Sequence, residues 1–207
     1  MLQSTPMRQS SMFWVGIATL LCAGLMACSG DTQQESRPVS TDTSTGEPTG
    51  QQEASFQDEE GPVGVRNYTR VDATVACAGA TPPEAMAELR SRGFTTVINF
   101  RTVAENGATV NAGRVAAEAA GLKYIHIPFR EPSAEVAETF LAAVGDPNNQ
   151  PAFIHCGSAN RVGAMWLIKR VKQDGYTVDN ALAEAEAIGL SSAGLREFAL
   201  DYVGAGN

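Results

Sequence analysis

Short apolar segments alternate with helical segments from residue 71 to residue 203, and this alternation most constrains the fold. The predicted strands are rich in β-branched and aromatic residues and lie at residues 71–77, 95–100, 123–129 and 151–155. The predicted helices lie at residues 81–92, 110–120, 133–144, 162–171, 178–188 and 192–203. Strands that alternate with helices predict a three-layer α/β/α domain with a central, mostly parallel sheet.

Residues that begin and end helices support these boundaries. Thr81 is predicted to cap the first helix, with two prolines in the first turn and Glu84 completing a capping box. Ser133 is the predicted cap of the third helix. Gly93 and Gly121 are predicted to end the first and second helices.

The first residues of the chain have the composition of an export signal. Residues 11–27 carry no charged side chain and form an apolar run that is short for a membrane span. Residues 25–28 (LMAC) resemble the lipobox of bacterial lipoproteins, in which the cysteine is acylated. We therefore expect residues 1–27 to be a lipoprotein signal peptide. An ordinary cleaved signal with a coincidental cysteine is the alternative.

Lipidation would decide where the protein resides. The resemblance to lipoproteins implies that Cys28 becomes the first mature residue and anchors the protein to a membrane through its lipid. Ser29 follows that cysteine, and by the same resemblance it favours an outer-membrane position facing the periplasm. The expected location is therefore exported and lipid-anchored.

Residues 28–60 have the composition of a disordered linker. Beyond alanine, this acidic, Ser- and Thr-rich segment contains one aliphatic residue, Val39, and one aromatic residue, Phe56. Such a segment cannot bury enough apolar surface to offset the entropy lost on ordering. The folded domain is accordingly predicted to occupy residues 61–207.

The charge of the chain is concentrated in the linker. Residues 29–60 contain eight acidic residues and one basic residue, a balance of −7, whereas residues 61–207 contain 15 acidic and 13 basic residues, a balance of −2. The isoelectric point of about 4.8 therefore mainly reflects the linker. No basic stripe indicates a nucleic-acid partner.

A cysteine and an arginine bracket a short run of small or polar residues after the last predicted strand (FIHCGSANR). A tight loop followed by a helix that opens near Val162 would aim backbone N–H groups at one point, where a dianion can bind. That field also favours the thiolate form of Cys156, which is the reactive one. Arg161 adds a planar cation suited to two phosphate oxygens. The sequence thus predicts an anion-binding cradle that contains a nucleophile.

Several segments together resemble the cysteine-dependent protein tyrosine and dual-specificity phosphatases. The similarity is greatest to their bacterial branch, the beta-lactamase-hydrolase-like phosphatases, and covers residues 68–203. It implies a phosphatase-type α/β fold, a phosphocysteine intermediate and neither a metal nor another cofactor. The matching features are residues 96–101 (TVINFR) with Glu105, residues 124–128 (YIHIP), the His155-Cys156 step and Arg161.

The resemblance also implies a role for each residue of the cradle. Cys156 is the nucleophile, and Arg161 binds the phosphoryl oxygens and stabilises the transition state. His155 orients the loop by a hydrogen bond. The remaining substrate-binding residues, which hold the oxygens through their backbone amides, are Gly157, Ser158, Ala159 and Asn160.

The general acid departs from the family pattern. The phosphatases use an Asp on the loop after the strand that corresponds to residues 124–128, and no Asp is present there. Glu131 is the nearest carboxylate and is the candidate general acid. An enzyme that lacks a general acid could still cleave aryl phosphates, because aryl leaving groups need little protonation, so a preference for aryl phosphates such as phosphotyrosine is predicted. The expected substrate is a phosphorylated small molecule or a phosphoprotein.

Three further departures leave other functions open. Four residues separate Cys156 from Arg161, a spacing shared with the six-residue loops of rhodanese-type sulfurtransferases. Ala159 stands where relatives usually have Gly, which costs on the order of 1 kcal/mol if φ is positive there. Val162 replaces the usual Ser or Thr after the arginine. The alternatives are therefore a sulfurtransferase and a catalytically weak module that binds phosphate or phosphopeptides.

Two predicted pairings of side chains complete the predictions. Arg101 and Glu105 are spaced to pair with each other after their strand. Cys77 ends the first predicted strand, and strand ends in open α/β sheets face the crevice. A reversible disulfide between Cys77 and Cys156 is one hypothesis, and a Cys77 thiol simply buried in its strand is the other.

Overall fold

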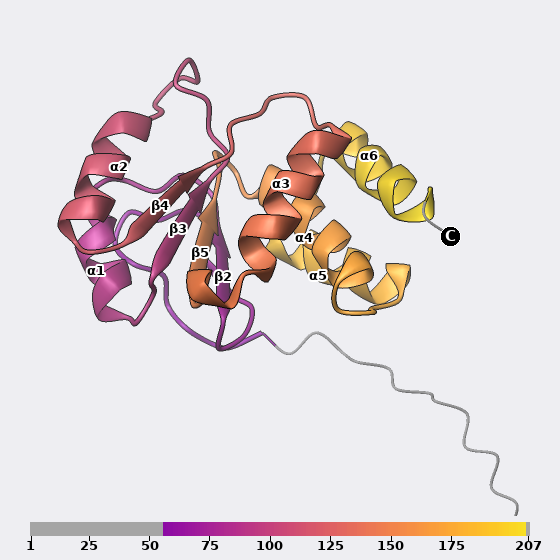
Figure 1. Cartoon of the computed structure of the whole chain (residues 1–207), viewed down its shortest axis with the longest axis horizontal. Coiled ribbons are helices and arrows are strands. Elements are labelled where there is room, and N and C mark those ends of the chain that lie inside the picture. The colour runs from indigo at the N-terminus through magenta and orange to yellow at the C-terminus, as the bar shows by residue number, and fades with distance from the viewer. Residues whose placement is uncertain (1–55, 206–207) are drawn as a thin grey trace, which may run out of the picture. The chain divides into compact units, whose positions relative to one another are not determined.

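A five-stranded sheet forms the centre of the protein in a computed structural model that describes residues 56–205 (Figure 1). The strand order is β1-β2-β5-β3-β4. All neighbouring strands are parallel except β1, which is antiparallel to β2. This arrangement confirms the α/β class and the mostly parallel sheet. The strands are β1 (Thr69–Arg70), β2 (Val75–Ala78), β3 (Thr96–Asn99), β4 (Lys123–His126) and β5 (Ala152–His155).

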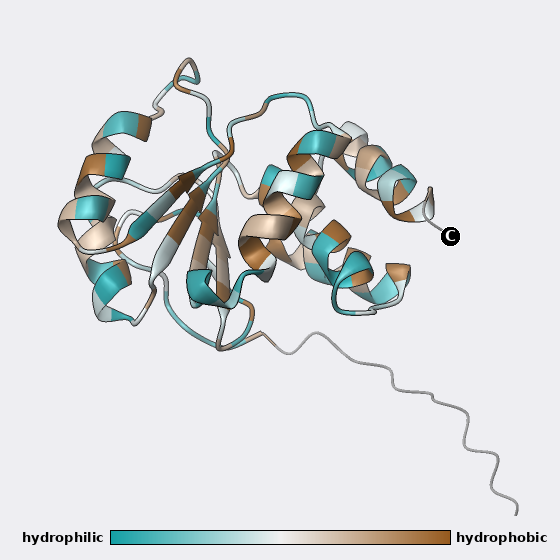
Figure 2. Ribbon diagram, in the orientation of Figure 1, coloured by the Kyte–Doolittle hydropathy of each residue, from teal (hydrophilic) through white to brown (hydrophobic). Residues whose placement is uncertain are grey.

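Six α-helices cover the two faces of the sheet. Figure 1 shows α1 and α2 on one side and α3, α4, α5 and α6 on the other, which gives the predicted three layers. Each face has its own hydrophobic cluster, and Figure 2 shows apolar residues along the central strands between them. The helices are α1 (Ala85–Ser91), α2 (Val110–Ala119), α3 (Ala134–Gly145), α4 (Asn160–Lys172), α5 (Val178–Ile188) and α6 (Ala193–Gly204), with a short 3₁₀ helix, η1 (Pro147–Asn149).

The register of the sheet aligns the ends of three strands. His155 of β5 pairs with Ala78 of β2 on one side and with Asn99 of β3 on the other. The residues that follow these strands therefore emerge at the same edge. This alignment brings the predicted cradle next to the segments that begin at Gly79 and Phe100.

The first predicted strand, residues 71–77, is wrong in its extent. The chain instead forms a hairpin in which β1 pairs with β2 across a turn. The Asp72 carboxylate oxygen Oδ1 accepts hydrogen bonds from the backbone N–H groups of Thr74 and Val75 at 2.7 and 3.0 Å. An Asp that caps its own turn in this way competes with an extended ladder, so the strand is interrupted.

The start of the first helix also differs from the prediction. Helix α1 begins at Ala85, and Glu84 occupies the N-cap position without a side-chain hydrogen bond. The Thr81 hydroxyl instead donates to the Gly79 carbonyl at 3.2 Å. The capping box is therefore absent, because two prolines keep Thr81 away from the first helical turn.

Most other boundaries agree with the sequence. The Ser133 hydroxyl accepts a hydrogen bond from the Val136 N–H at 3.3 Å and caps α3 as predicted. Gly93 and Gly121, just after α1 and α2, have φ of +90° and +76°. Strand β4 ends at His126, earlier than predicted, although the Ile127 N–H still donates to the Asn99 carbonyl of β3 at 3.0 Å.

Folded contacts begin before the predicted boundary at residue 61. Phe56 packs against the larger hydrophobic cluster, and the Gln57 N–H donates to the Arg70 carbonyl at 2.9 Å. Glu59 pairs with Arg92 at 2.8 Å. The last residues of the predicted linker thus belong to the domain.

The other predictions for the first part of the chain concern residues that the structure does not describe. The signal peptide at residues 1–27, the lipidated Cys28 and the linker up to residue 55 all lie outside the described residues. Within residues 56–205, none of the helices is long and apolar enough to cross a membrane.

Candidate active site

The loop after β5 packs directly against the segment after β2. The Cys156 N–H donates to the Ala78 carbonyl at 3.2 Å, and the Ala80 N–H donates to the Gly157 carbonyl at 3.1 Å. A Cβ atom at Gly79 would lie 3.3 Å from the Ser158 Cα. A glycine at position 79 therefore allows the two segments to approach this closely.

The backbone turns sharply into α4 at Ala159. This residue is buried and adopts the left-handed conformation with φ of 69° as the N-cap of α4. The condition under which Ala is costly at this position, a positive φ, is therefore met, and a Gly would fit here without strain. Helix α4 begins at Asn160, two residues before the predicted opening at Val162.

Consecutive backbone N–H groups are left free around the cysteine. Those of Gly157, Ser158 and Ala159 donate no hydrogen bond to any of residues 56–205. Asn160 and Arg161 are the first two residues of α4, where N–H groups have no intrahelical acceptor. Free amides at a helix N-terminus bind anions such as phosphate. The loop therefore has the donors that the cradle requires.

Arg161 is held firmly along one edge of its guanidinium group. Its Nη1 donates to the backbone carbonyls of Phe100 and Phe129 at 2.9 and 2.6 Å. Nη1 and Nη2 also donate to the two carboxylate oxygens of Glu105, at 2.7 and 2.8 Å. The Nε–H and the second Nη2–H donate no hydrogen bond to the described part of the chain. These two donors share one edge of the fork, which suits bidentate binding of a phosphoryl group.

Glu105 and Arg161 form a mostly buried ion pair, with side chains 17% and 13% exposed. Burial opposes the charged form of Glu105, but hydrogen bonds from Arg161 and from the Thr102 N–H outweigh it and lower the pKa of Glu105 to about 2. Burial also opposes the charge on Arg161, yet its hydrogen bonds to Glu105 and the electrostatic effect of the nearby Cys156 sulfur raise the pKa of Arg161. Both groups are therefore charged at neutral pH.

The ion pair of Glu105 with Arg161 was not predicted from the sequence. Its predicted local pair with Arg101 forms, with Nε of Arg101 3.4 Å from the Glu105 carboxylate, but the shorter bonds of that carboxylate go to Arg161. A cation at a helix N-terminus is unfavourable by itself. That imbalance, together with a carboxylate at the end of an adjacent strand, is the signal that could have identified the pair.

The hydrogen bond predicted from His155 to the loop stays a prediction. His155 is buried, and neither ring nitrogen has a hydrogen-bond partner among the described residues. Burial lowers the pKa of His155 to about 3, and the positive charge of Arg101 acts in the same direction. His155 is therefore neutral at physiological pH and supports the loop by packing in the core.

The Asn160 side chain supports the loop from the outside. Its Oδ1 accepts hydrogen bonds from the backbone N–H groups of Ser191 and Ser192, both at 2.7 Å. Its Nδ2 donates to the Ser158 hydroxyl at 3.3 Å. The side chain thus ties the cradle to the turn between α5 and α6, so only the backbone of Asn160 is available for the predicted substrate binding.

Glu131 is not brought into contact with the cradle. It is exposed on the loop after β4, and its side chain makes no hydrogen bond or ion pair within residues 56–205. The Phe129 carbonyl, two residues earlier, accepts the hydrogen bond from Arg161. The loop that carries Glu131 therefore borders the site, and the role of Glu131 as general acid stays a prediction.

Cys77 and Cys156 are both buried free thiols. In the sheet register, Cys77 lies opposite Ile154, two residues before Cys156. Burial raises the pKa of Cys77 well above its ordinary value, which keeps that thiol protonated and unreactive. The disulfide between the two cysteines stays a hypothesis.

Within residues 56–205, no group of three or more His, Cys, Asp or Glu side chains is arranged to hold a metal ion. Arg161, Glu105 and Arg101 are charged groups beside the cradle. They form a continuous chain of ion pairs from the loop to the end of β3. This edge of the sheet thus has cationic groups next to the Cys156 thiol.

Solved structures of phosphatases share this fold. A DUF442 protein from Shewanella putrefaciens CN-32 is 21% identical, with a TM-score of 0.60, over 69% of this chain and 91% of that chain. Pseudomonas aeruginosa TpbA is 18% identical, with a TM-score of 0.57, over 74% of this chain and 91% of that chain. The catalytic core of Saccharomyces cerevisiae Siw14 is 17% identical, with a TM-score of 0.55, over 68% and 86%.

A search of the curated proteins gives no match. Residues 67–173 match the family described as beta-lactamase hydrolase-like protein, phosphatase-like domain. The matched segment runs from Asn67 to Gln173, the residue after α4, and contains Glu105, Cys156 and Arg161. It comprises 107 of the 207 residues (173 − 67 + 1). The chain therefore belongs to the phosphatase-like domain family of the beta-lactamase hydrolase-like proteins.

Proposed function

We propose that the protein is a cysteine-dependent hydrolase of phosphomonoesters that acts through a phosphocysteine intermediate. One observation carries the proposal. Arg161 is fixed along one edge by Glu105 and two backbone carbonyls, and two of its N–H donors are left free close to Cys156. Membership of a phosphatase-like family supports the same reaction class.

The geometry supports a two-step mechanism. The Cys156 thiolate attacks phosphorus, the bond from phosphorus to the leaving oxygen breaks, and that oxygen receives a proton. Water then attacks the phosphocysteine, releasing inorganic phosphate and restoring the thiolate. In both steps the free loop amides and Arg161 stabilise the negative charge on the equatorial oxygens. Glu105 keeps the Arg161 fork in place during both steps.

Glu131 is the best candidate for the proton donor. Glu105 is closer to Arg161, but its pKa of about 2 leaves it deprotonated at neutral pH, so it cannot act as an acid. Glu131 is exposed and belongs to a loop anchored to the site through Phe129. Because Glu131 is exposed and has no fixed partner, we expect it to protonate the leaving group inefficiently. Aryl phosphates, which need little protonation, are therefore the proposed preferred substrates.

Similar structures guide the choice of substrate. A Cys-to-Ser variant of Pseudomonas aeruginosa TpbA was solved in complex with phosphotyrosine, and Siw14 is described as a PP-IP phosphatase. A phosphotyrosine-type ester is the proposed substrate class here. Sulfur transfer is the competing function, because the loop has the length found in sulfurtransferases.

A single assay panel tests the reaction class. The full chain should hydrolyse para-nitrophenyl phosphate, and the Cys156→Ser variant should lose this activity. Acid quenching during turnover should trap phosphate on Cys156, which mass spectrometry of the digested protein can locate. Sulfur transfer from thiosulfate to cyanide without phosphate release would overturn the proposal. Phosphate binding with neither activity would indicate a binding module instead.

A second comparison tests the general acid. The Glu131→Gln variant should lose more activity on phenyl phosphate than on para-nitrophenyl phosphate, because phenolate is the poorer leaving group. Glu135→Gln, an exposed carboxylate in the first turn of α3, is the matched control. Equal losses on both substrates would remove Glu131 from the mechanism. Faster turnover of phosphotyrosine than of phosphoserine peptides is expected in either case.

The proposed site of action is the periplasmic face of the outer membrane, with the protein anchored through lipid on Cys28. The lipobox-like residues 25–28 support this location. Growth of the expressing cells with a labelled fatty acid should label the full-length chain. The Cys28→Ser variant should carry no label and should no longer be found in the membrane fraction. A labelled Cys28→Ser variant would contradict the proposed anchor.

A further inference from the structure

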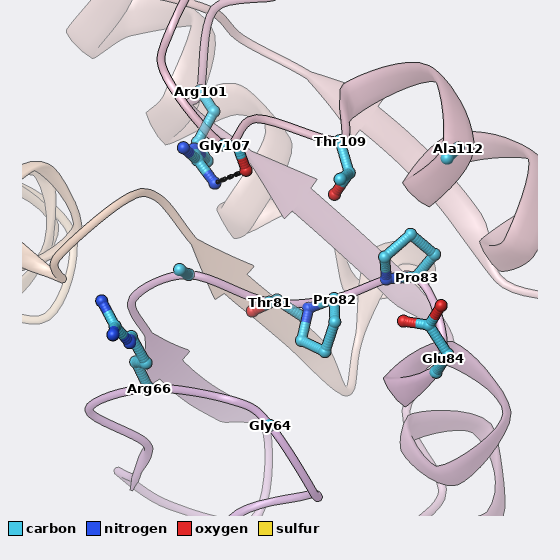
Figure 3. Close-up of a pocket in the computed structure, with 11 residues that line it drawn as sticks. Gly64, Arg66, Thr81, Pro82, Pro83, Glu84, Arg101, Gly107, Thr109 and Ala112 are labelled. Carbon is cyan, nitrogen blue, oxygen red and sulfur yellow. Dashed lines mark hydrogen bonds between the residues drawn. The ribbon is translucent and has the colours of Figure 1, made fainter.

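A pocket of about 500 Å³ is lined in part by residues that follow β2 and β3, the two strands that flank β5. Figure 3 shows the residues that line it. It is large enough for an aromatic ring or a monosaccharide. Rigid apolar surface on one wall comes from Pro82 and Pro83, and hydroxyl groups come from Thr81 and Thr109. Two arginines, Arg66 and Arg101, also line it. None of these groups has a part in the proposed phosphoryl chemistry.

Hydrogen bonds join the pocket wall to the cradle. The Arg66 N–H donates to the Ala80 carbonyl at 3.0 Å, and the Gly79 N–H donates to the Arg66 carbonyl at 2.7 Å. The Ala80 N–H in turn donates to the Gly157 carbonyl at 3.1 Å. The segments that line the pocket are therefore bonded directly to the cradle loop.

A second connection fixes the direction of the arginine segment. Asn67 has a positive φ of 48°, and its side-chain Nδ2 donates to the Ser158 carbonyl at 3.2 Å. This bond clamps the residue after Arg66 onto the cradle loop. Backbone held in a sparsely populated conformation beside an active site is a frequent sign of a functional constraint.

The two pocket arginines differ in their partners. The Arg101 guanidinium donates to the carbonyls of Asn106 and Gly107 at 2.9 and 3.0 Å and contacts Glu105. Arg66 is exposed, and its side chain forms no ion pair or hydrogen bond with any of residues 56–205. In Figure 3 the two arginines lie toward one end of the pocket and Glu84 toward the other. The end with the arginines has excess positive charge.

We infer that this pocket binds a second anionic group of the substrate, so that the preferred phosphomonoesters carry a carboxylate or another phosphate on a compact organic part. Arg66 is the ligand for that group, because it is the pocket arginine with free donors. Arg101 adds positive charge from a fixed position. The inference rests on the proposed phosphatase function and specifies its substrate class.

Four aryl phosphates test the inference. The 2-, 3- and 4-carboxyphenyl phosphates vary the position of the second anion, and 3-carbamoylphenyl phosphate is the neutral match of the 3-carboxy compound. At least one carboxylated isomer should have a higher kcat/KM than the neutral compound. The Arg66→Ala variant should reduce this preference about fivefold through KM, as expected for one exposed ion pair of about 1 kcal/mol.

Two controls separate the pocket from general electrostatics. Arg114→Ala removes one positive charge from the exposed face of α2, away from the pocket, and should leave the preference unchanged. Arg66→Glu should reverse the preference in favour of the neutral compound. An equal effect of Arg66→Ala and Arg114→Ala would overturn the inference, as would a wild-type protein without any preference for the carboxylated isomers.

Binding measurements keep the inference independent of turnover. The same compounds should bind the full-chain Cys156→Ser variant with the same order of affinity in calorimetry. If wild-type protein hydrolyses none of them, the proposed function fails, while the affinity ratio still decides the pocket. The same ratio measured with a bisphosphate, 1,3-phenylene bisphosphate, shows whether carboxylate or phosphate is the preferred second group.

Discussion

Two arginines at one edge of the sheet differ in almost every respect. Arg161, in the cradle, is largely buried and bonded to Glu105 and to two carbonyls at the end of neighbouring strands. Arg66, in the adjacent pocket, is exposed and has no partner among residues 56–205. The first is held in one geometry by the interior of the protein. The second is free to adapt to whatever enters the pocket.

Under the proposed function, this difference corresponds to two tasks. A group that stabilises a transition state must be in place before the reaction, because reorganisation during the reaction raises the barrier. A group that selects the organic part of a substrate needs only to reach its charge. We therefore expect changes in the cradle to lower turnover of all phosphomonoesters equally, and changes in the pocket to alter only the preference among them.

The largest effect is expected from Arg161→Lys. Lysine keeps the charge, but it cannot bridge two phosphoryl oxygens and the Glu105 carboxylate at the same time. We expect kcat/KM to fall about 10³-fold. The loss should be the same for phenyl phosphate and 3-carboxyphenyl phosphate in steady-state kinetics. A loss confined to the carboxylated substrate would show that Arg161 also selects, which would break the comparison.

Protonation of His155 in acid should lower the free energy of unfolding of the domain. Its folded pKa of about 3 is below the ordinary value of 6.5, so the unfolded chain binds the proton more tightly. The stability from neutral His155 is complete above about pH 6.5 and is lost as pH falls toward 3, on the order of 5 kcal/mol in all. Urea unfolding across this range should show the slope, and His155→Asn should flatten it. An unchanged slope would contradict the pKa.

Glu105→Gln should disconnect Arg161 from its support. Removing one partner of a mostly buried pair is costly, so we expect kcat/KM to fall about 30-fold on charged and neutral substrates alike. Glu118→Gln, in the exposed pair with Arg114, is the matched control and should have no effect on turnover. A selective effect on carboxylated substrates would place Glu105 in the pocket instead.

Glu105 also has a pH signature of its own. Its folded pKa of about 2 is below the ordinary value of 4.5, so its contribution is present above about pH 4.5 and is lost as pH falls toward 2. The shift corresponds to on the order of 3 kcal/mol. Glu105→Gln should remove this part of the acid sensitivity in urea titrations, while the decline between pH 6.5 and 4.5 should persist.

A smaller effect is expected from Asn160→Ala. The variant leaves the N–H groups of Ser191 and Ser192 without their acceptor, which should lower the free energy of unfolding by about 1 to 2 kcal/mol. Turnover should fall a few-fold on every substrate. Ser191→Ala, which keeps the backbone donor, is the control and should be nearly silent. Equal losses in the two variants would show that the hydroxyl matters rather than the Asn160 carbonyl.

The smallest effect is expected from Ala159→Gly. Relief of the positive φ gains about 1 to 2 kcal/mol, whereas the lost buried methyl group and the freer unfolded chain each cost about 0.5 to 1 kcal/mol. The free energy of unfolding should therefore change by less than about 1 kcal/mol. Ala159→Val is the contrast and should be strongly destabilising, since a β-branched residue is poorly tolerated at this φ. Similar stability of both variants would argue against the strain.

Features that depend on neighbouring residues were predictable from the sequence. Ser133 caps α3 because its hydroxyl reaches an N–H group three residues ahead, and Val178–Ile188 forms α5 with the predicted limits. Predictions failed where two local signals competed. Thr81 has the residue type of a cap, but the two prolines after it delay the helix, and Asp72 interrupts an otherwise apolar strand with a turn.

The sequence by itself determined the α/β order of the elements and the loop that joins Cys156 to Arg161, because both depend on residues close together in the chain. Only the tertiary structure decided what surrounds that loop. Glu105 is 56 residues from Arg161 in sequence, and Asn160 is 31 from Ser191. Such contacts depend on the register of β2, β5 and β3 and on the position of the α5–α6 turn. The same register brings Arg66 to the edge of the cradle, because it sets which strand ends meet.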